Sequence, residues 1–395
     1  MKGRGLVALA LAALGAAALA ATAGAGSSAV SGSQAVVSCK SPIKLGIVTP
    51  LTGGGGFIGQ EQVTWAKYGV KNLSKKYGLK VTLVQADTPI EKGGGEAIIV
   101  SQKLISDPKV MAIIGPSTSG GAASASNALT AAGLVQISPS ATRTSLTKGT
   151  NREATSSFFR VVPGDYIQGP TDANFMVDKL KVKKVVIIDF QEPYSVGLGD
   201  AATIVLKKRG VDVIRQSTSV NTTDFSSLVT RVPNDTDVVF FPSQQAADAQ
   251  TFAQQLLEQG KKAKVFGGDG TNSPADFHVT GSYVSNFAPD ISGIASNKAL
   301  IAGWQKDNPK AKLGSFGPPT YLAVEVALNA IKKACDAGNG QIKNRKDIVK
   351  QVKKINLKTS ILGGPFRFST KSNDPLNAKF YIFQIQSNGT YKLVG

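Results

Sequence analysis

Histidine and cysteine are almost absent from this chain of 395 residues, which has one His and two Cys. A His/Cys zinc site or an iron–sulfur cluster needs more of these ligands, so both are excluded. A catalytic triad would have to use the single imidazole, His278, which lies in a polar stretch and is interpreted as a surface residue. The composition therefore predicts no metal site and gives little support to hydrolytic catalysis.

Acidic residues are also scarce, because 26 Asp and Glu stand against 45 Lys and Arg, a formal net charge of +19. Such a balance is typical of proteins that bind nucleic acids or membrane surfaces. The basic residues, however, are scattered in short pairs such as Lys75-Lys76 and Lys183-Lys184, without interleaved aromatic residues. We interpret them as solvated helix faces and predict no nucleic-acid partner.

Long hydrophobic runs are lacking, with one exception at the start of the chain. Lys2 and Arg4 precede an Ala/Leu-rich run over residues 6–23, and small residues then offer an A-x-A cleavage site. This layout is typical of a secretory signal peptide, here residues 1–25. An uncleaved membrane anchor is the alternative, since about 20 apolar residues can span a bilayer. We expect an exported protein, in the periplasm or at the cell-envelope exterior, with a flexible segment over residues 26–41.

Export gives a specific meaning to the two cysteines, Cys39 and Cys335. An even number of cysteines outside the cytoplasm favours one disulfide. Residues 36–39 also resemble a lipoprotein processing box, in which Cys39 would carry the lipid. A Ser/Gly/Gln-rich stretch separates this box from the apolar run, and lipidation would leave Cys335 unpaired. A disulfide is favoured, while a lipid anchor through Cys39 and two free thiols stay open.

From residue 42 onward, short apolar runs alternate with helical patterns. Strands are expected at 43–48, 81–84, 110–114 and 134–137 and, where the alternation restarts after residues 158–162, at 184–188, 211–214, 237–241 and 263–266. Helices are expected at 60–76, 96–106, 119–132, 196–209, 245–259, from 321, and at 347–355. Apolar strands separated by helices are typical of parallel βαβ units. A hairpin of residues 380–385 and 391–394 ends the chain. We predict an α/β fold of two doubly wound, Rossmann-like lobes, with the ligand at the carboxyl ends of the strands.

Three motifs of nucleotide and acyl chemistry are considered, and each is rejected on its context or on a missing residue. Gly54–Gly59 satisfies G-x-G-x-x-G, but residues 49–52 separate it from the strand, and the nearest strand-end acid, Asp87, lies beyond the usual spacing of about 20 residues. Gln60-Glu61 stands where a P-loop needs Lys-Ser/Thr. The nucleophile elbow G-x-S-x-G lacks its last glycine at Ser119. We therefore predict no cofactor and no enzymatic activity.

Hydroxyl-rich turns follow two consecutive predicted strands, at residues 115–121 and 138–142. Hydroxyls and free N–H groups at the start of a helix suit a carboxylate, although a helix N-cap alone needs only one Ser or Thr. In the second lobe, Asp269 lies among glycines at a strand end, where an acid either forms a turn or pairs with an ammonium group. Donors in one lobe and an acid in the other suit a zwitterion held between the lobes.

The chain resembles the branched-chain amino-acid binding proteins of ABC transporters, which have the type I periplasmic binding-protein fold, over essentially all of residues 42–395. The resemblance rests on the order and spacing of short motifs: Ile43–Thr52 with its Gly-rich loop, Ile113–Pro116 with Ser119, Ile137–Thr142, Gln168-Gly169, Tyr194 before Gly197, Asp224–Ser226 and Gly267–Gly270.

The resemblance implies three chain crossovers that form a hinge between the lobes. They are expected near residues 160–164, 284–290 and 370–380. Lobe one would then comprise residues 42–161 and 288–372, and lobe two residues 162–287 and 373–395. Closure about this hinge would enclose the ligand.

The resemblance also implies roles for single residues. Ser119 and Thr142 would bind the α-carboxylate of an amino acid. The Ser140 carbonyl and the Thr142 hydroxyl would accept the ammonium group, which Asp269 would pair with, and Tyr194 would close over the ligand.

The sequence departs from the family at the side-chain end of the expected pocket. Ile58, next to Phe57, and Gln244 each occupy a position where the family commonly has an aromatic residue. Asp269 occupies the position of the usual Glu. The complete set of expected ligand-binding residues is Ser119, Ser140, Ala141, Thr142, Tyr194, Gln244, Asp269, Phe57 and Ile58.

The resemblance implies a monomeric receptor that captures an amino acid, branched-chain or related, and delivers it to a permease and an ATPase on separate chains. The alternative is the same fold with another small carboxylate or an amide, such as an aromatic acid, as ligand.

Overall fold

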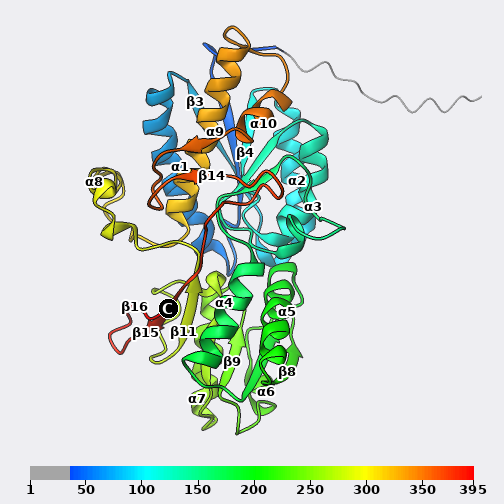
Figure 1. The fold of residues 1–395 in the computed structure, drawn as a ribbon, viewed down its shortest axis with the longest axis vertical. Helices are drawn as coiled ribbons and strands as arrows, with labels where there is room; N and C mark the ends of the chain where they lie inside the picture. Colours follow the sequence, from blue (N-terminus) through cyan, green and yellow to red (C-terminus); the bar gives the residue numbers. More distant parts are fainter. Residues whose placement is uncertain (1–35) are drawn as a thin grey trace, which may run out of the picture. The chain divides into compact units, whose positions relative to one another are not determined.

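Two β-sheets organise the chain in the computed structural model, which describes residues 36–395 (Figure 1). The first sheet has five strands in the order β3-β2-β4-β5-β6, and the second has seven in the order β16-β15-β11-β10-β9-β7-β8. The predicted signal peptide, residues 1–25, lies outside the described residues. Among the described residues, no helix is long and apolar enough to cross a bilayer.

The first sheet is entirely parallel. Its strands are β2 (Ile43–Thr49), β3 (Val81–Asp87), β4 (Val110–Ile114), β5 (Val135–Ser138) and β6 (Phe158–Arg160). β4, β5 and β6 are buried along their whole length, which explains their continuous apolar character. Parallel strands all run in the same direction, so the carboxyl ends of β2, β4 and β5 lie at one edge of the sheet.

Helices cover both faces of this sheet (Figure 1). On one face α1 (Gly56–Tyr77) packs against α9 (Gly317–Ala337), and on the other α2 (Gly93–Ser106) packs against α3 (Ser119–Ala131). The larger core lies under α1 and α9, where Trp65 stacks on Trp304 with ring centroids 4.7 Å apart. The shorter α8 (Lys298–Asp307) and α10 (Lys346–Val352) pack beside α1 and α9 respectively.

The second sheet is parallel except for its last two strands. Its strands are β7 (Lys184–Asp189), β8 (Asp212–Ser217), β9 (Val238–Phe241), β10 (Lys264–Gly267), β11 (Tyr283–Asn286), β15 (Tyr381–Ile385) and β16 (Tyr391–Leu393). α4 (Asp165–Asp178) and α5 (Pro193–Lys208) cover one face, and α6 (Ser226–Thr230) and α7 (Ala246–Glu258) the other. The chain ends in the predicted hairpin.

The predicted elements are largely present, but several begin earlier than expected. α1 begins at Gly56 instead of residue 60, so Phe57 and Ile58 lie in its first turn and not in a loop. α9 begins at Gly317, because two prolines in a first helical turn lose no helical hydrogen bond. α4, α6, α8 and β11 were not predicted from the sequence. The remaining short elements are β1 (Val37–Ser38), β12 (Gln341–Ile342), β13 (Asn356–Leu357) and β14 (Phe366–Arg367).

The chain passes between the two sheets three times. It leaves the first sheet after β6, returns after β11, and crosses again between β14 and β15. An apolar cluster at these crossings joins Ile58 with Val162, Phe287 and Phe380. The fold is thus a two-lobed α/β fold with three crossovers; the expected lobe boundaries stay predictions. We call the part built on the first sheet lobe one and the part built on the second sheet lobe two.

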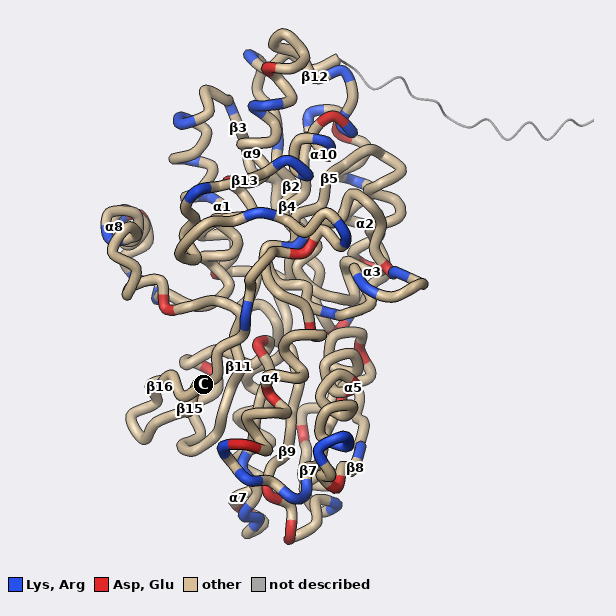
Figure 2. The backbone as a smooth tube through the Cα atoms, viewed as in Figure 1, with Lys and Arg blue, Asp and Glu red and all other residues tan. Residues whose placement is uncertain are grey.

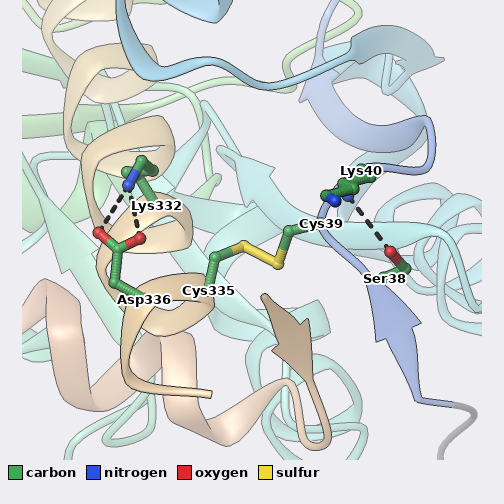
Figure 3. Close-up of a disulfide and its surroundings, with 6 residues drawn as sticks. All are labelled: Ser38, Cys39, Lys40, Lys332, Cys335 and Asp336. Carbon is green, nitrogen blue, oxygen red and sulfur yellow. Dashed lines mark hydrogen bonds and ion pairs between the residues drawn. A yellow bond between two sulfur atoms is a disulfide. The ribbon is translucent and has the colours of Figure 1, made fainter. Parts of the chain in front are cut away.

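A disulfide joins Cys39 to Cys335 near the end of α9 (Figure 3). It is one of the three states that the sequence left open for these cysteines. β1 pairs with β12 beside it, with Val37 opposite Ile342. Residues 37–39 are therefore held on lobe one, which corrects the expectation of a flexible segment reaching residue 41.

Lys and Arg are distributed over both lobes without one continuous track (Figure 2). Several are paired, such as Lys332 with Asp336 and Arg209 with Asp178. This distribution agrees with the interpretation of the positive charge as solvated surface.

Candidate functional site

The expected carboxylate-binding residues lie where β4 and β5 end. Ser119 is the first residue of α3, whose N-cap Thr118 accepts a hydrogen bond of 3.1 Å from the Gly121 N–H. The Ser119 Oγ accepts a hydrogen bond of 3.2 Å from the Arg143 N–H, which ties the two turns together. Ser119 and Thr142 are fully buried. The two turns therefore present hydroxyl groups at one sheet edge, beside the N-terminus of α3.

Ser140 and Ala141 are held by the turn after β5. The Ser140 hydroxyl donates to the Ser117 carbonyl at 2.7 Å and accepts from the Gln62 amide at 2.9 Å. The Ala141 N–H donates to the Ser138 Oγ at 3.0 Å, and its carbonyl accepts from the Arg160 guanidinium at 3.2 Å. Both polar groups of Ala141 therefore already have partners in the protein, whereas no protein donor is described for the Ser140 carbonyl.

In lobe two, Asp269 follows the end of β10 and is buried. The Tyr194 hydroxyl donates to its Oδ1 at 2.8 Å and accepts from the Gly270 N–H at 3.2 Å. Burial raises the pKa of Asp269 to about 6, while hydrogen bonds from Gln168 and Tyr194 partly offset this rise. No basic side chain of the described residues forms an ion pair with Asp269. An external cation would supply the missing counter-charge.

Asp165, which the sequence reading did not single out, belongs to the same cluster. It is the first residue of α4, and its N–H donates to the Thr142 carbonyl at 2.8 Å. Both carboxylate oxygens are buried without a hydrogen-bond partner of normal geometry in the described part of the chain. Burial and the nearby charge of Asp269 raise the pKa of Asp165 to about 8, although the Thr142 hydroxyl lowers it. Thr142, Asp165 and Asp269 therefore lie close together across the two lobes.

Further polar groups of lobe two extend this cluster along α4, where acidic positions are visible in Figure 2. Gln168 donates to the Ser285 Oγ at 2.9 Å, which in turn donates to Asp172 at 3.0 Å. Burial raises the pKa of Asp172 well above its ordinary value, with smaller contributions from Asp269 and Asp165. The spacing Asp165, Gln168, Asp172 places three polar side chains on one face of α4. That spacing is a signal only once α4 is recognised as a helix, and the Gly169-Pro170 pair inside it obscures this.

Contacts between the lobes surround these groups. The Arg143 guanidinium donates to the Pro193 carbonyl, and a Cβ added at Gly120 would lie 3.4 Å from the Pro193 ring. Glu192 caps α5 by accepting from the Tyr194 and Ser195 N–H groups, and burial raises its pKa to about 7. The turn after β5 is thus in contact with the start of α5, which carries Tyr194.

The other expected side chains lie nearby, at the starts of α1 and α7. Gln244 is buried with no partner for its Oε1 in the described part of the chain, and its carbonyl lies 3.5 Å from a Cβ built on Gly55. Phe57 packs edge-on against Phe316 with ring centroids 5.9 Å apart, and Ile58 belongs to the apolar cluster at the crossovers. Their roles toward a ligand stay predictions.

Two lobes, three crossovers and buried polar groups on both facing edges define a class of protein: a two-lobed receptor for a small solute. The periplasmic binding protein family model matches residues 42–390, so the chain belongs to the periplasmic binding protein family.

Individual relatives agree with this assignment. The chain is 28% identical to the Leu/Ile/Val-binding protein BraC3 of Rhizobium johnstonii, over 79% of this chain and 86% of that protein. It is 25% identical to the Leu/Ile/Val-binding protein of Citrobacter freundii, over 88% and 92% of the two chains.

Solved structures share the fold. The leucine-binding protein LivK of Thermotoga maritima has a TM-score of 0.78 and 21% identity, covering 89% of this chain and 98% of that one. A solute-binding protein of R. palustris in complex with benzoate has a TM-score of 0.77 and 18% identity, covering 90% and 96%. The fold is thus common to receptors whose described ligands differ in charge.

Proposed function

We propose that the protein is an extracytoplasmic receptor of an ABC importer, which captures an amino acid between its two lobes and delivers it to a membrane permease. The observation that carries the proposal is the buried Asp269–Tyr194 pair in lobe two, which forms no ion pair among the described residues and lies near Asp165, itself in contact with the buried Thr142 of lobe one. The names of the relatives, which are Leu/Ile/Val-binding proteins, support an amino acid as ligand. ATP hydrolysis belongs to a separate chain, and we propose no catalytic role for this one.

Each end of an amino acid finds matching groups in this arrangement. The α-carboxylate would accept hydrogen bonds from the Ser119 and Thr142 hydroxyls beside the N-terminus of α3, where the helix dipole favours an anion. The ammonium group would donate to the Ser140 carbonyl and pair with Asp269. Tyr194 would cover the ligand, and its hydrogen bond fixes the Asp269 carboxylate in place.

The side-chain end of the pocket would be formed by Phe57, Ile58 and Gln244. This end of the pocket would be mixed in polarity. Ile58 is apolar, whereas the buried Gln244 side chain has an amide oxygen without a hydrogen-bond partner among the described residues. A branched-chain or related amino acid is the ligand class we propose.

Closure of the hinge would couple the two halves of the site. A ligand held by lobe one gains Asp269 and Tyr194 only when lobe two is in contact, so binding shifts the population toward the closed state. In this proposal, contacts between the lobes such as that of Arg143 with Pro193 would form on closure. The permease would distinguish the closed receptor from the open one.

A second candidate ligand is a small carboxylate or amide without an ammonium group, such as an aromatic acid. It is favoured by the raised pKa of Asp165, about 8, because a carboxyl group that is protonated near neutral pH can face a ligand that carries no positive charge. The benzoate complex of the R. palustris protein shows that this fold holds such an acid.

Calorimetric titration with a panel of amino acids and aromatic acids tests the proposal. We expect heat with at least one aliphatic amino acid, and Asp269→Asn should weaken that binding by at least about 100-fold, since an ammonium loses its buried partner. Asp235→Asn, which changes an exposed acid of the same lobe, is the matched control and should bind normally. Heat with benzoate and none with any amino acid would favour the second candidate.

A further inference from the structure

Gln62, on α1, connects the ends of three strands through one buried amide group. Its Oε1 accepts from the Thr49 hydroxyl at 2.6 Å and from the Ser117 hydroxyl at 2.7 Å, and its Nε2 donates to the Ser140 hydroxyl at 2.9 Å. Thr49 ends β2, while Ser117 and Ser140 lie in the turns after β4 and β5. All four side chains are buried.

The pattern of donors and acceptors leaves the amide a single orientation. The hydroxyls of Thr49 and Ser117 donate to the amide oxygen. The Ser140 hydroxyl donates its own proton to the Ser117 carbonyl at 2.7 Å, so toward Gln62 it can only accept, and the amide nitrogen must face it. The single proton of the Ser140 hydroxyl is therefore used inside the protein. What Ser140 can offer to a ligand is its main-chain carbonyl, and the direction of that carbonyl depends on this network.

The start of α1 reaches the strand ends because of one glycine. A Cβ added at Gly59 would lie 1.9 Å from the Pro50 carbonyl oxygen, so only glycine allows the helix to approach this loop so closely. Gln62 follows one turn later on the same helix. The close approach places its amide among the three strand ends.

We propose that Gln62 is a positioning residue of the binding site: it fixes the separation of the turn that carries Ser119 from the turn that carries Ser140 and Thr142. This inference rests on the proposed function for its effect on ligand affinity. Without the amide, three buried hydroxyls would lose a partner, and such groups re-form their hydrogen bonds by moving toward water or toward each other. Both turns would move, although Gln62 itself does not touch the ligand.

The chain offers a matched control in Gln136, a second buried glutamine of lobe one. Its amide donates to the Ser126 carbonyl at 3.2 Å, to the Thr130 hydroxyl at 3.2 Å and to the Ser157 hydroxyl at 3.1 Å, and none of these partners lies in the two turns. Gln62→Leu and Gln136→Leu remove comparable buried hydrogen bonds. Both are expected to lower the melting temperature, but only Gln62→Leu should change the site.

Two measurements on the whole protein separate positioning from general stability. The first measurement is hydrogen–deuterium exchange in the absence of any ligand. In Gln62→Leu the exchange rate should increase at least about threefold both in peptides covering residues 115–121 and in peptides covering residues 138–144. Gln136→Leu should not show this joint increase. With leucine as the probe, Gln62→Leu should raise Kd at least about tenfold and Gln136→Leu less than about twofold. Equal effects of the two variants in either measurement would overturn the proposal.

Gln62→Glu provides a readout that a purely structural role would not change. The introduced carboxyl group can still donate to Ser140 while it is protonated, but not once it is ionised. The ratio of the variant's Kd to that of the unaltered protein should therefore increase as the pH rises. A ratio independent of pH would contradict the inference. If the unaltered protein binds no amino acid, the proposed function fails, while the exchange experiment still decides the role of Gln62.

Discussion

Asp165 and Asp269 illustrate how burial changes a carboxyl group that forms no ion pair within the described residues. Desolvation is the largest cause of the raised pKa of each, and for Asp165 the charge of Asp269 adds to it. An ammonium group brought between them would favour the ionised forms. Binding of a zwitterion is therefore expected to release protons from the site.

The first prediction concerns the pH dependence of binding. Affinity for an amino acid should increase with pH by up to about tenfold per pH unit for each carboxyl group that must lose its proton: up to about pH 6 for Asp269 and up to about pH 8 for Asp165. Asp165→Asn should flatten this increase at its upper end, where Asp269 is already ionised. Calorimetry in buffers of different ionisation enthalpy measures the protons released. An Asp165→Asn variant with an unchanged pH profile would exclude Asp165 from the site.

Part of the candidate site could be predicted from residues alone. The turns with Ser119 and Thr142, and Asp269, follow strands whose apolar runs are unmistakable, and parallel strands bring their carboxyl ends to one edge. Asp165 could not be predicted in the same way, because it belongs to α4, a helix that the sequence pattern does not predict. Gln62 could not either, since a polar residue in an amphipathic helix is normally on the exposed face.

Among the elements, α4 explains why sequence reasoning was incomplete. Gly169-Pro170 is a common turn signal, yet both residues lie inside this helix. A Cβ at Gly169 would lie 2.7 Å from the backbone of Ala201, so the glycine is required where α4 packs on α5. A tertiary contact thus outweighs local propensity here, and the helix carries Asp165 and Gln168 to the site.

The crossovers are held by a buried ion pair. Arg160, which ends β6, contacts Asp374 with 2.7 Å between Nε and Oδ1, and both side chains are at most 1% exposed. The same guanidinium donates to the carbonyls of Ala141 and Arg143, on either side of Thr142. One side chain therefore links the first and third crossovers to the turn after β5.

The second prediction follows from this pair. Arg160→Met should lower the free energy of unfolding by about 3–5 kcal/mol, because Asp374 would be left buried without its partner. Denaturation by urea measures the loss. Arg160→Met combined with Asp374→Asn should recover part of it, since the uncompensated charge is gone. If the double variant is less stable than Arg160→Met, the pair is not the source of the effect.

At the scale of the whole molecule, several buried or half-buried carboxyl groups have raised pKa values. Besides Asp165 and Asp269 they include Glu61, whose pKa of about 7 is raised chiefly by burial and which accepts from the Gly317 N–H at the start of α9 at 2.6 Å. Glu192 has a pKa of about 7 for the same main reason. In an unfolded chain these carboxyl groups have their ordinary pKa values of about 4.

The third prediction is that the ligand-free protein becomes more stable as the pH falls from about 8 to about 5. A raised carboxyl pKa contributes stability that is complete below the unfolded value and lost as the pH rises through the folded value. Each such group contributes a slope of up to about 1.4 kcal/mol per pH unit. Thermal unfolding across this range measures the trend, and a bound amino acid should reduce it. A melting temperature that falls on acidification to about pH 5 would contradict this balance of charges.

The disulfide between Cys39 and Cys335 has a practical consequence for studying the receptor. It attaches the start of the described chain to lobe one, through α9, at a sequence separation of 296 residues. A surface linker attached ahead of Val37 would therefore immobilise lobe one and leave lobe two, with Asp269, free to move. A fluorescent label at the same place would report from lobe one. This arrangement makes the oxidised protein a natural starting point for a biosensor that reports solute capture as motion.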